Sequence, residues 1–270
     1  MSKIEKALER ARKKRLAGEG GTHSPVAVEA PRLQEPAYTC TKVISLDGGR
    51  LEKHRLMTLL DDPEATDCYN LLRTQVLEKT RKKVHNTIVV TSVLDGEGKT
   101  VTAINLAVSM AREVKQTVLL VDTDLRNPKV HHYLGCRVDK GLSDYLLNDV
   151  PIAELLINPG LAKLVVLPMG KRLPGSTDIL SSPKMENLVA ELKHRYPERY
   201  VIFDCPPVLT APDTLIFSSY VDGVILVVEA GKTRRDQIHK AVELLEGRNI
   251  LGVVMNKLRE AGKTYYYHYY

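Results

Sequence analysis

The stretch NTIVVTSVLDGEGKT, residues 86–100, joins an apolar run to a glycine-rich turn that ends in Gly-Lys-Thr. A phosphate-binding loop lies between a strand and a helix, and a glycine-rich turn in that position is the setting it needs. Gly96 and Gly98 let backbone N–H groups close around phosphate oxygens, and the start of the helix adds partial positive charge. We therefore predict a nucleotide site in which Lys99 reaches the β- and γ-phosphates and Thr100 holds Mg²⁺.

One position departs from the general phosphate-loop pattern, G-x-x-x-x-G-K-[ST]. Its first glycine would stand at residue 93, where this chain has Val93. The alternative is a glycine-rich β–α turn of any α/β protein, but G-x-G-K-T after a strand is uncommon turn chemistry. The residues of this loop that we expect to bind the nucleotide are Gly96, Glu97, Gly98, Lys99, Thr100 and Val101.

Acidic residues end two further apolar runs. VLLVDTDLRNP, residues 118–128, carries Asp122 and Asp124, and YVIFDCPPVL, residues 200–209, carries Asp204. Ligands bind beside the carboxyl ends of parallel strands, and Asp122 and Asp124 lie on one side of an extended chain. Acids placed there beside nucleotide phosphates favour a bound Mg²⁺. For Asp122 taken alone, a helix N-cap or a solvated loop acid is the alternative.

Strands and helices alternate from about residue 61 onward. The apolar runs predict strands at 86–93, 117–121, 164–167, 200–203, 223–228 and 250–255. Helical patterns cover 67–82, 100–112, 182–196 and 234–245, with shorter helical segments after residue 143 and near 213–220. This alternation predicts an α/β fold with a doubly wound, mostly parallel sheet flanked by helices. Since Trp is absent and Phe is scarce, the core is expected to consist of Val, Ile, Leu and Ala.

Composition divides the 270 residues into three parts. We expect a basic N-terminal helix and flexible linker at 1–60, a folded domain at 61–258 and a C-terminal tail at 259–270. Within the first part, the helix covers 2–16 and the linker proper covers 17–36. A short strand is also expected at 38–46.

The net charge of +6 is concentrated at the N-terminus, because residues 1–16 alone carry +5. A nucleic-acid-binding domain needs basic surface on the fold itself, so we expect no nucleic-acid partner. The helix at 2–16 has a narrow apolar stripe of Ile4, Leu8 and Ala11. Either this stripe docks on an anionic membrane or a partner helix, or the helix stays solvated.

The four cysteines are widely spaced and form no C-x-x-C pair, which is typical of free thiols in a reducing compartment. No apolar run approaches the roughly 20 residues that span a bilayer. The N-terminal basic residues are not followed by the apolar segment of a secretory signal. The expected location is therefore the cytoplasm.

The tail is unusually rich in phenols: its tyrosines are Tyr265, Tyr266, Tyr267, Tyr269 and Tyr270. A core can hardly bury residues at a chain end, and a row of exposed phenols is costly without a use. Together with the nucleotide site, this predicts an ATP-driven enzyme whose substrate is its own tail, in cis or on a neighbouring chain.

Four motifs in a fixed order, DGEGKT (95–100), DTDLR (122–126), DCPP (204–207) and TYYYHYY (264–270), resemble the bacterial tyrosine kinases (BY-kinases). These are the autokinases of capsule and exopolysaccharide export. The opening SKIEKALERARKKR is similar to the subgroup found in exosortase-associated loci. The resemblance implies a P-loop NTPase fold of the Min/Par-like type at 61–258. It also implies a protein-tyrosine autokinase that uses ATP and Mg²⁺ to phosphorylate its tyrosine cluster in trans, regulating polysaccharide synthesis and export.

The resemblance also assigns catalytic roles. Lys99 and Thr100 bind phosphate and Mg²⁺, Asp122 and Asp124 support the metal and the attacking phenol, and Asp204 holds the metal through water. A phenol with a pKa of about 10 is a poor nucleophile at neutral pH, so a carboxylate must accept its proton, and Asp122 is the candidate.

Two further residues receive roles in the same way. Arg126 steadies phosphate or the Asp122–Asp124 pair, and Asn256, at the end of GVVMN, contacts adenine. One departure concerns assembly: where the family has E-x-x-R-x-x-R at its subunit interface, this chain has Asp67, Asn70 and Arg73. They share one helix face, but one basic charge is lost, so the usual ring is not implied.

The resemblance implies partners as well. We expect a homo-oligomer, a membrane-anchored polysaccharide co-polymerase that activates the kinase, and a cognate tyrosine phosphatase. The kinase would then be cytoplasmic and peripheral to the inner membrane through its partner.

Two other functions compete with the kinase hypothesis. A Min/Par-type regulatory ATPase without protein kinase activity is the main alternative. Such proteins carry a signature lysine in K-G-G-x-G-K-T, and this chain has Leu94 at that position. The second alternative is a non-enzymatic regulator with a docking tail, which intact Lys99 and Asp204 disfavour.

Overall fold

The structure, a computed structural model, describes residues 41–258. The helix expected at 2–16, the linker at 17–36 and the five tail tyrosines lie outside the described residues. Within the described part, one sheet has the strand order β1-β4-β5-β3-β6-β2-β7-β8. Its strands are β1 (Lys42–Val43), β2 (Thr87–Ser92), β3 (Thr117–Asp122), β4 (Ile157–Asn158), β5 (Leu164–Leu167), β6 (Arg199–Asp204), β7 (Gly223–Glu229) and β8 (Ile250–Asn256).

The sheet is parallel except where β4 meets β5. The predicted doubly wound, mostly parallel sheet is therefore confirmed. Each of the six predicted strands lies within one residue of its expected bounds. Continuous apolar runs are easy to place because strands covered on both faces need apolar side chains at every position.

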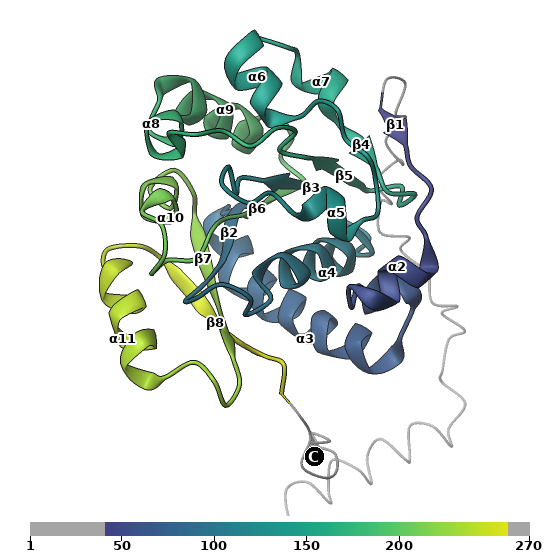
Figure 1. Cartoon of the computed structure of the whole chain (residues 1–270). Coiled ribbons are helices and arrows are strands. Elements are labelled where there is room, and N and C mark those ends of the chain that lie inside the picture. Colours follow the sequence, from purple (N-terminus) through teal and green to yellow (C-terminus); the bar gives the residue numbers. More distant parts are fainter. Residues whose placement is uncertain (1–40, 259–270) are drawn as a thin grey trace, which may run out of the picture. The chain divides into compact units, whose positions relative to one another are not determined.

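Helices cover both faces of the sheet (Figure 1). One face carries α2 (Gly48–Lys53), α3 (Pro63–Thr80), α4 (Lys99–Ala111) and α5 (Val130–Tyr133), with the 3₁₀ turns η1 (Met57–Leu60) and η2 (Arg81–Lys83) nearby. The other face carries α6 (Leu142–Asn148), α7 (Ile152–Leu155), α8 (Ser176–Leu180), α9 (Pro183–His194), α10 (Asp213–Phe217) and α11 (Arg235–Leu244).

Neighbouring residues of one strand feed two separate cores. On β2, Val89 belongs to the core under α9 and α11, while Ile88 and Val90 belong to the core under α3 and α4. This is the two-residue alternation of an extended chain. The helix α4 is buried on nearly every side, which explains its apolar sequence and fixes the position of the loop that precedes it.

Residues 48–60 belong to the folded domain, so the predicted boundary at residue 61 is too late. Leu51 and Leu56 are buried in the core under α3 and α4. Thr58 donates from its backbone N and its Oγ1 to Asn105 Oδ1 of α4, at 3.1 and 2.6 Å. The sequence pattern failed here because two buried leucines among charged residues show no clear helical period.

The other elements that the sequence pattern missed are also short. They are α5, α7, α8 and the two-residue strand β4, whereas β1 falls inside the short strand expected at 38–46. None of the helices within 41–258 is long and apolar enough to cross a bilayer.

Part of the α3 face that was expected at a subunit interface forms contacts within the chain instead. Asn70 accepts a hydrogen bond from Ser109 Oγ of α4 at 2.9 Å, and Arg73 donates to the Ser109 carbonyl at 2.9 Å. Arg73 also lies 3.9 Å from the carboxylate of Glu113. Only Asp67 of this trio is exposed.

We expect Leu56→Ala to lower the free energy of unfolding by about 2–5 kcal/mol, because it removes a fully buried side chain from a packed core. Leu60→Ala, at a 37% exposed position of the same segment, should cost less than about 1 kcal/mol. Urea titration followed by circular dichroism measures both values. Equal and small losses would mean that residues 48–60 do not fold with the domain.

Candidate nucleotide site

The loop between β2 and α4 has the backbone geometry of an anion cradle. Gly96 and Gly98 have φ angles of 80° and 99°, in the region that favours glycine. A Cβ atom on Gly98 would lie 2.1 Å from Asn256 Nδ2. Since Gly98 caps the N-terminus of α4, the free N–H groups of the helix start face the space beside this loop.

The end of β8 and the residue after it brace the loop from one side. Asn256 Nδ2 donates to the Glu97 carbonyl at 2.8 Å, and Lys257 Nζ donates to the Gly96 carbonyl at 2.6 Å. Lys257 also pairs with Glu229 of β7 at 3.0 Å. Asn256, expected at adenine, thus lies directly against the loop.

The Glu97 side chain shapes the loop from within. It is 3% exposed, and its carboxylate accepts hydrogen bonds from the Leu94 N–H at 2.8 Å and the Thr233 hydroxyl at 2.5 Å. Because these bonds occupy its carboxylate, Glu97 can contribute to phosphate binding only through its backbone N–H group.

The structure brings the predicted lysine, threonine and acids together. Asp122 and Asp204 stand opposite each other at the ends of neighbouring strands β3 and β6. Lys99 Nζ lies 2.8 Å from Asp124 Oδ2 and 3.6 Å from Asp204 Oδ1. The Thr100 hydroxyl donates to Asp204 Oδ2 at 2.7 Å. One ammonium group therefore lies among three carboxylates in the interior.

Backbone donors fix the orientation of Asp122. Its Oδ2 accepts from the N–H groups of Lys129 and Val130 at 3.1 and 3.0 Å, and its Oδ1 accepts from the Asp124 N–H at 3.2 Å. These bonds bind the start of α5 to the end of β3. Asp122 is fully buried, so it is not the solvated loop acid that the sequence allowed as an alternative.

Burial and mutual repulsion dominate the electrostatics of the cluster. Burial, and then the charge of Asp204, raise the pKa of Asp122, and burial raises the pKa of Asp204 against the pull of Lys99. Burial alone would lower the pKa of Lys99, but the carboxylates of Asp204 and Asp124 raise it well above its ordinary value. A positive charge close to these carboxylates therefore stabilises their ionised form.

The residues present suit Mg²⁺ held together with a nucleotide. Asp204 Oδ1 is buried and has no hydrogen-bond partner in the described part of the chain, which leaves a lone pair free for water or a cation. Among the described residues, no three His, Cys, Asp or Glu side chains converge as metal ligands. Mg²⁺ commonly uses one or two protein oxygens, waters and substrate phosphates, and Asp204 with Thr100 meets that need.

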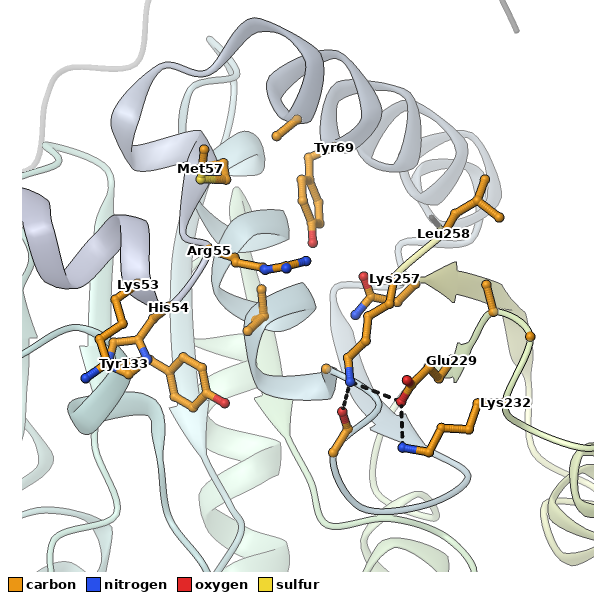
Figure 2. Close-up of a pocket in the computed structure, with 17 residues that line it drawn as sticks. Lys53, His54, Arg55, Met57, Tyr69, Tyr133, Glu229, Lys232, Lys257 and Leu258 are labelled. Atoms are coloured by element: carbon orange, nitrogen blue, oxygen red, sulfur yellow. Dashed lines mark hydrogen bonds and ion pairs between the residues drawn. The ribbon is translucent and has the colours of Figure 1, made fainter. Parts of the chain in front are cut away.

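A cavity of about 1030 Å³ adjoins the loop (Figure 2). Its volume is at the upper end of the usual range for ligand pockets. Gly96, Gly98 and Val101 line it on the loop side. The remaining lining residues are Lys53, His54, Arg55, Met57, Ala65, Tyr69, Tyr133, Glu229, Ala230, Gly231, Lys232, Asn256, Lys257 and Leu258.

Arg126, expected to steady phosphate or the Asp122–Asp124 pair, forms its side-chain hydrogen bonds with a different acid. Its Nε and Nη2 donate to the two carboxylate oxygens of Asp213 on α10, at 2.9 and 3.1 Å. Asp213 is fully buried and also accepts from the Thr177 hydroxyl at 3.1 Å. This bidentate pair connects the loop after β3 to α8 and α10.

Sequence reasoning missed several residues of this region. Glu229 and Lys257 stand at or just after the ends of β7 and β8, so the strand-end argument that found Asp122 and Asp204 would have found them too. Asp213 had a signal in the motif PPVLTAPD, residues 206–213. No local signal indicated Arg55 or Tyr69, because their place in the cavity depends on how α2 and α3 pack.

Comparison with known proteins places the chain among nucleotide-binding proteins. A protein-family model described as an AAA domain matches residues 85–246. The chain is 32% identical to Tyrosine-protein kinase CpsD of Streptococcus agalactiae, over 73% of this chain and 85% of that protein. It is 33% identical to Tyrosine-protein kinase YwqD of Bacillus subtilis (strain 168), over 82% of this chain and 93% of that protein.

Solved structures agree with these relatives. The chimerical protein CapA2B2 has a TM-score of 0.70 and 30% identity, covering 80% of this chain and 93% of that one. The kinase domain of Escherichia coli tyrosine kinase ETK has a TM-score of 0.68 and 26% identity, covering 76% and 80%. The septum site-determining protein MinD of Pyrococcus horikoshii OT3, complexed with Mg-ADP, has a TM-score of 0.53 and 25% identity, covering 63% and 69%.

Gly98→Ala is expected to weaken ATP binding by at least about tenfold, because a Cβ there would clash with Asn256 and adopt a strained φ angle. Gly96→Ala is the matched control, since Gly96 has a similar φ angle of 80° but no atom within 4 Å of an added Cβ. Calorimetric titration with ATP measures both affinities. An equal loss in the two variants would show that contact with Asn256 does not shape the site.

Proposed function

The chain belongs to the bacterial tyrosine kinases and is a nucleotide-binding protein-tyrosine kinase, and we propose that it phosphorylates the tyrosine cluster at 265–270 of a second copy. One observation supports this most: the ammonium of Lys99 and the hydroxyl of Thr100 meet the carboxylate of Asp204 beside the loop. That arrangement suits a metal–triphosphate, and the chain ends in the acceptor groups that such a kinase needs.

We assign Lys99 to the β- and γ-phosphates, and Thr100 and Asp204 to Mg²⁺, the latter through water. Phosphoryl transfer needs positioning and charge neutralisation above all. A bound Mg²⁺ would draw charge from the phosphates during transfer. Lys99 now lies among carboxylates that compensate its charge, so it is already desolvated where the phosphates would arrive. The backbone N–H groups of 96–101 complete the cradle.

We assign the acceptor side of the reaction to Asp122 and Asp124. The phenol must lose its proton as its oxygen attacks the γ-phosphate, and Asp122 is our proposed acceptor. Its orientation is fixed by three backbone N–H groups. Asp124 bonds to Lys99 and accepts from the Asn127 N–H at 2.9 Å, which suits a positioning role.

The position of the last described residue favours the tail as substrate. Leu258 lines the cavity next to the loop, and 12 residues follow it in the sequence. Fully extended, they span at most about 40 Å, enough to reach a neighbouring site in an oligomer. A tethered tail reaches millimolar effective concentration at such a site.

We propose that this activity regulates exopolysaccharide or capsule synthesis and export. The kinase would act at the inner membrane through a membrane-anchored activator, and a cognate phosphatase would reverse it. The relatives named as tyrosine-protein kinases support the chemistry.

One observation favours the alternative of a Min/Par-type regulatory ATPase, namely the likeness of the fold to MinD. Against it, Leu94 stands where that class carries its signature lysine. An ATPase of that kind would also leave its own tyrosines unmodified, so phosphotyrosine mapping separates the two.

Incubation with Mg-ATP is expected to place phosphate on the tail tyrosines, and Lys99→Met should abolish this transfer because the phosphate-binding ammonium is lost. Mass spectrometry after digestion measures the sites. Lys82→Met, at an exposed lysine of η2, is the matched control and should retain full activity.

A mixing experiment tests transfer between chains. Full-length Lys99→Met, which keeps its tail, is combined with active protein truncated after Lys263, which has no tail tyrosines. Transfer in trans predicts phosphate on the Lys99→Met tail. Phosphate that appears only in unmixed wild-type protein would indicate transfer in cis, and its absence from every sample would refute the proposed substrate.

Full phosphorylation of five tyrosines would add roughly −8 to −10 of charge to each chain. Like-charged tails repel at moderate salt, so we expect the phosphorylated oligomer to dissociate. Light scattering before and after phosphatase treatment measures the mass. An unchanged mass would exclude charge-driven dissociation.

A further inference from the structure

The cavity beside the loop carries more positive than negative side chains. Of its cations, Lys232 and Lys257 both pair with Glu229, at 3.3 and 3.0 Å. Among the described residues that line the cavity, Glu229 is the one with an acidic side chain. Two other cations, Lys53 and Arg55, come from the segment that precedes α3. The described part of the lining therefore holds positive charge that none of its carboxylates neutralises.

Arg55 is the member of this set that extends into the cavity. Figure 2 shows its side chain below Tyr69, with Lys257 on the facing side, whereas Lys53 lies at the far end beside Tyr133. Within the described part of the chain, no hydrogen bond or ion pair engages the Arg55 guanidinium group. Its charge is thus available to a ligand that lies against the loop.

The Arg55 backbone is held in an unfavourable conformation. Its φ angle is 56°, in the left-handed region, which glycine or asparagine tolerates far better than arginine. Its carbonyl accepts from Asn105 Nδ2 at 3.1 Å, and the same amide donates to the Val101 carbonyl at 2.9 Å. A strained residue that is fixed by its surroundings is a candidate for function.

The anchor of Arg55 belongs to the helix that starts the nucleotide site. Asn105 is fully buried on α4 and also binds Thr58 of η1 through its Oδ1. Val101, whose carbonyl Asn105 contacts, lines the cavity directly after Thr100. The position of Arg55 is consequently set relative to the helix N-terminus and its loop.

We propose that Arg55 is a further nucleotide-binding residue, whose guanidinium group binds the phosphates of ATP from the wall opposite the loop. This inference rests on the proposed nucleotide site and adds a residue outside its motifs. A guanidinium offers several N–H donors in one plane and stays charged at every physiological pH. It supplies charge that Lys232 and Lys257 do not, since both are paired with Glu229.

Arg55→Gly tests the proposal without endangering the fold. Glycine adopts a φ angle of 56° freely, so the melting temperature of the variant should not fall. ATP affinity should drop by about tenfold, as for a lost charge-assisted contact, while adenosine affinity stays constant. Arg55→Lys should recover part of the ATP affinity. Calorimetry with ATP and with adenosine, and kcat and KM for ATP, are the measurements.

Lys82→Ala removes the same charge from exposed η2 and should leave ATP affinity unchanged. Equal ATP affinity of Arg55→Gly and wild type would overturn the proposal, as would a parallel loss of adenosine binding, which would indicate a contact with the base. These results are distinct from failure of the nucleotide site itself, in which wild-type protein would bind no ATP.

Discussion

Two carboxylates, Asp122 and Asp204, lie side by side at the ends of β3 and β6 with no exposed surface. Charges in this environment are costly unless they are compensated. In the structure, compensation comes from Lys99, from the Thr100 hydroxyl and from the N–H groups at the start of α5. The start of α4 and the loop after β3 each bring a compensating group to this acidic pair at the ends of β3 and β6. Asp204 Oδ1 lies 3.6 Å from the Lys99 ammonium but accepts no hydrogen bond in the described chain, so it keeps a lone pair for water or a cation.

The remaining architecture keeps the loop in one geometry. The strand β2 lies between β6 and β7, so the loop that follows it faces the acid of β6 on one side and Glu229 of β7 on the other. Lys257 connects Glu229 to the Gly96 carbonyl, and Asn256 lies so close to the loop that a Cβ atom at Gly98 would clash with its amide. Glu97 binds the loop to Thr233. A phosphate cradle formed mainly by backbone groups requires such bracing, because its affinity depends on several N–H groups pointing at one place.

Much of this arrangement was predictable, for reasons specific to the residues. Buried parallel strands need continuous apolar runs, so β2, β3 and β6 could be located, and with them the meeting point of Lys99, Asp122 and Asp204. The partner of Arg126 could not be found in this way, because Asp213 comes from α10, which packs at a distance in sequence. The segment 48–60 was missed because its few buried residues, such as Leu51 and Leu56, form short turns without a period. Its place in the fold follows from the burial of these two leucines and from the contacts of Asn105.

The walls of the cavity come from the two ends of the described chain. Residues 53–57 supply one wall and residues 256–258 part of the other. The first wall is hydrogen-bonded to Asn105 of α4. The second is hydrogen-bonded to the Glu97 carbonyl, in the loop that precedes α4. A ligand that contacts both walls stabilises residues 53–57 and residues 256–258 together, because it binds only when both segments are folded in place. Conversely, any partner that displaces residues 53–57 would change the nucleotide site without touching its motifs.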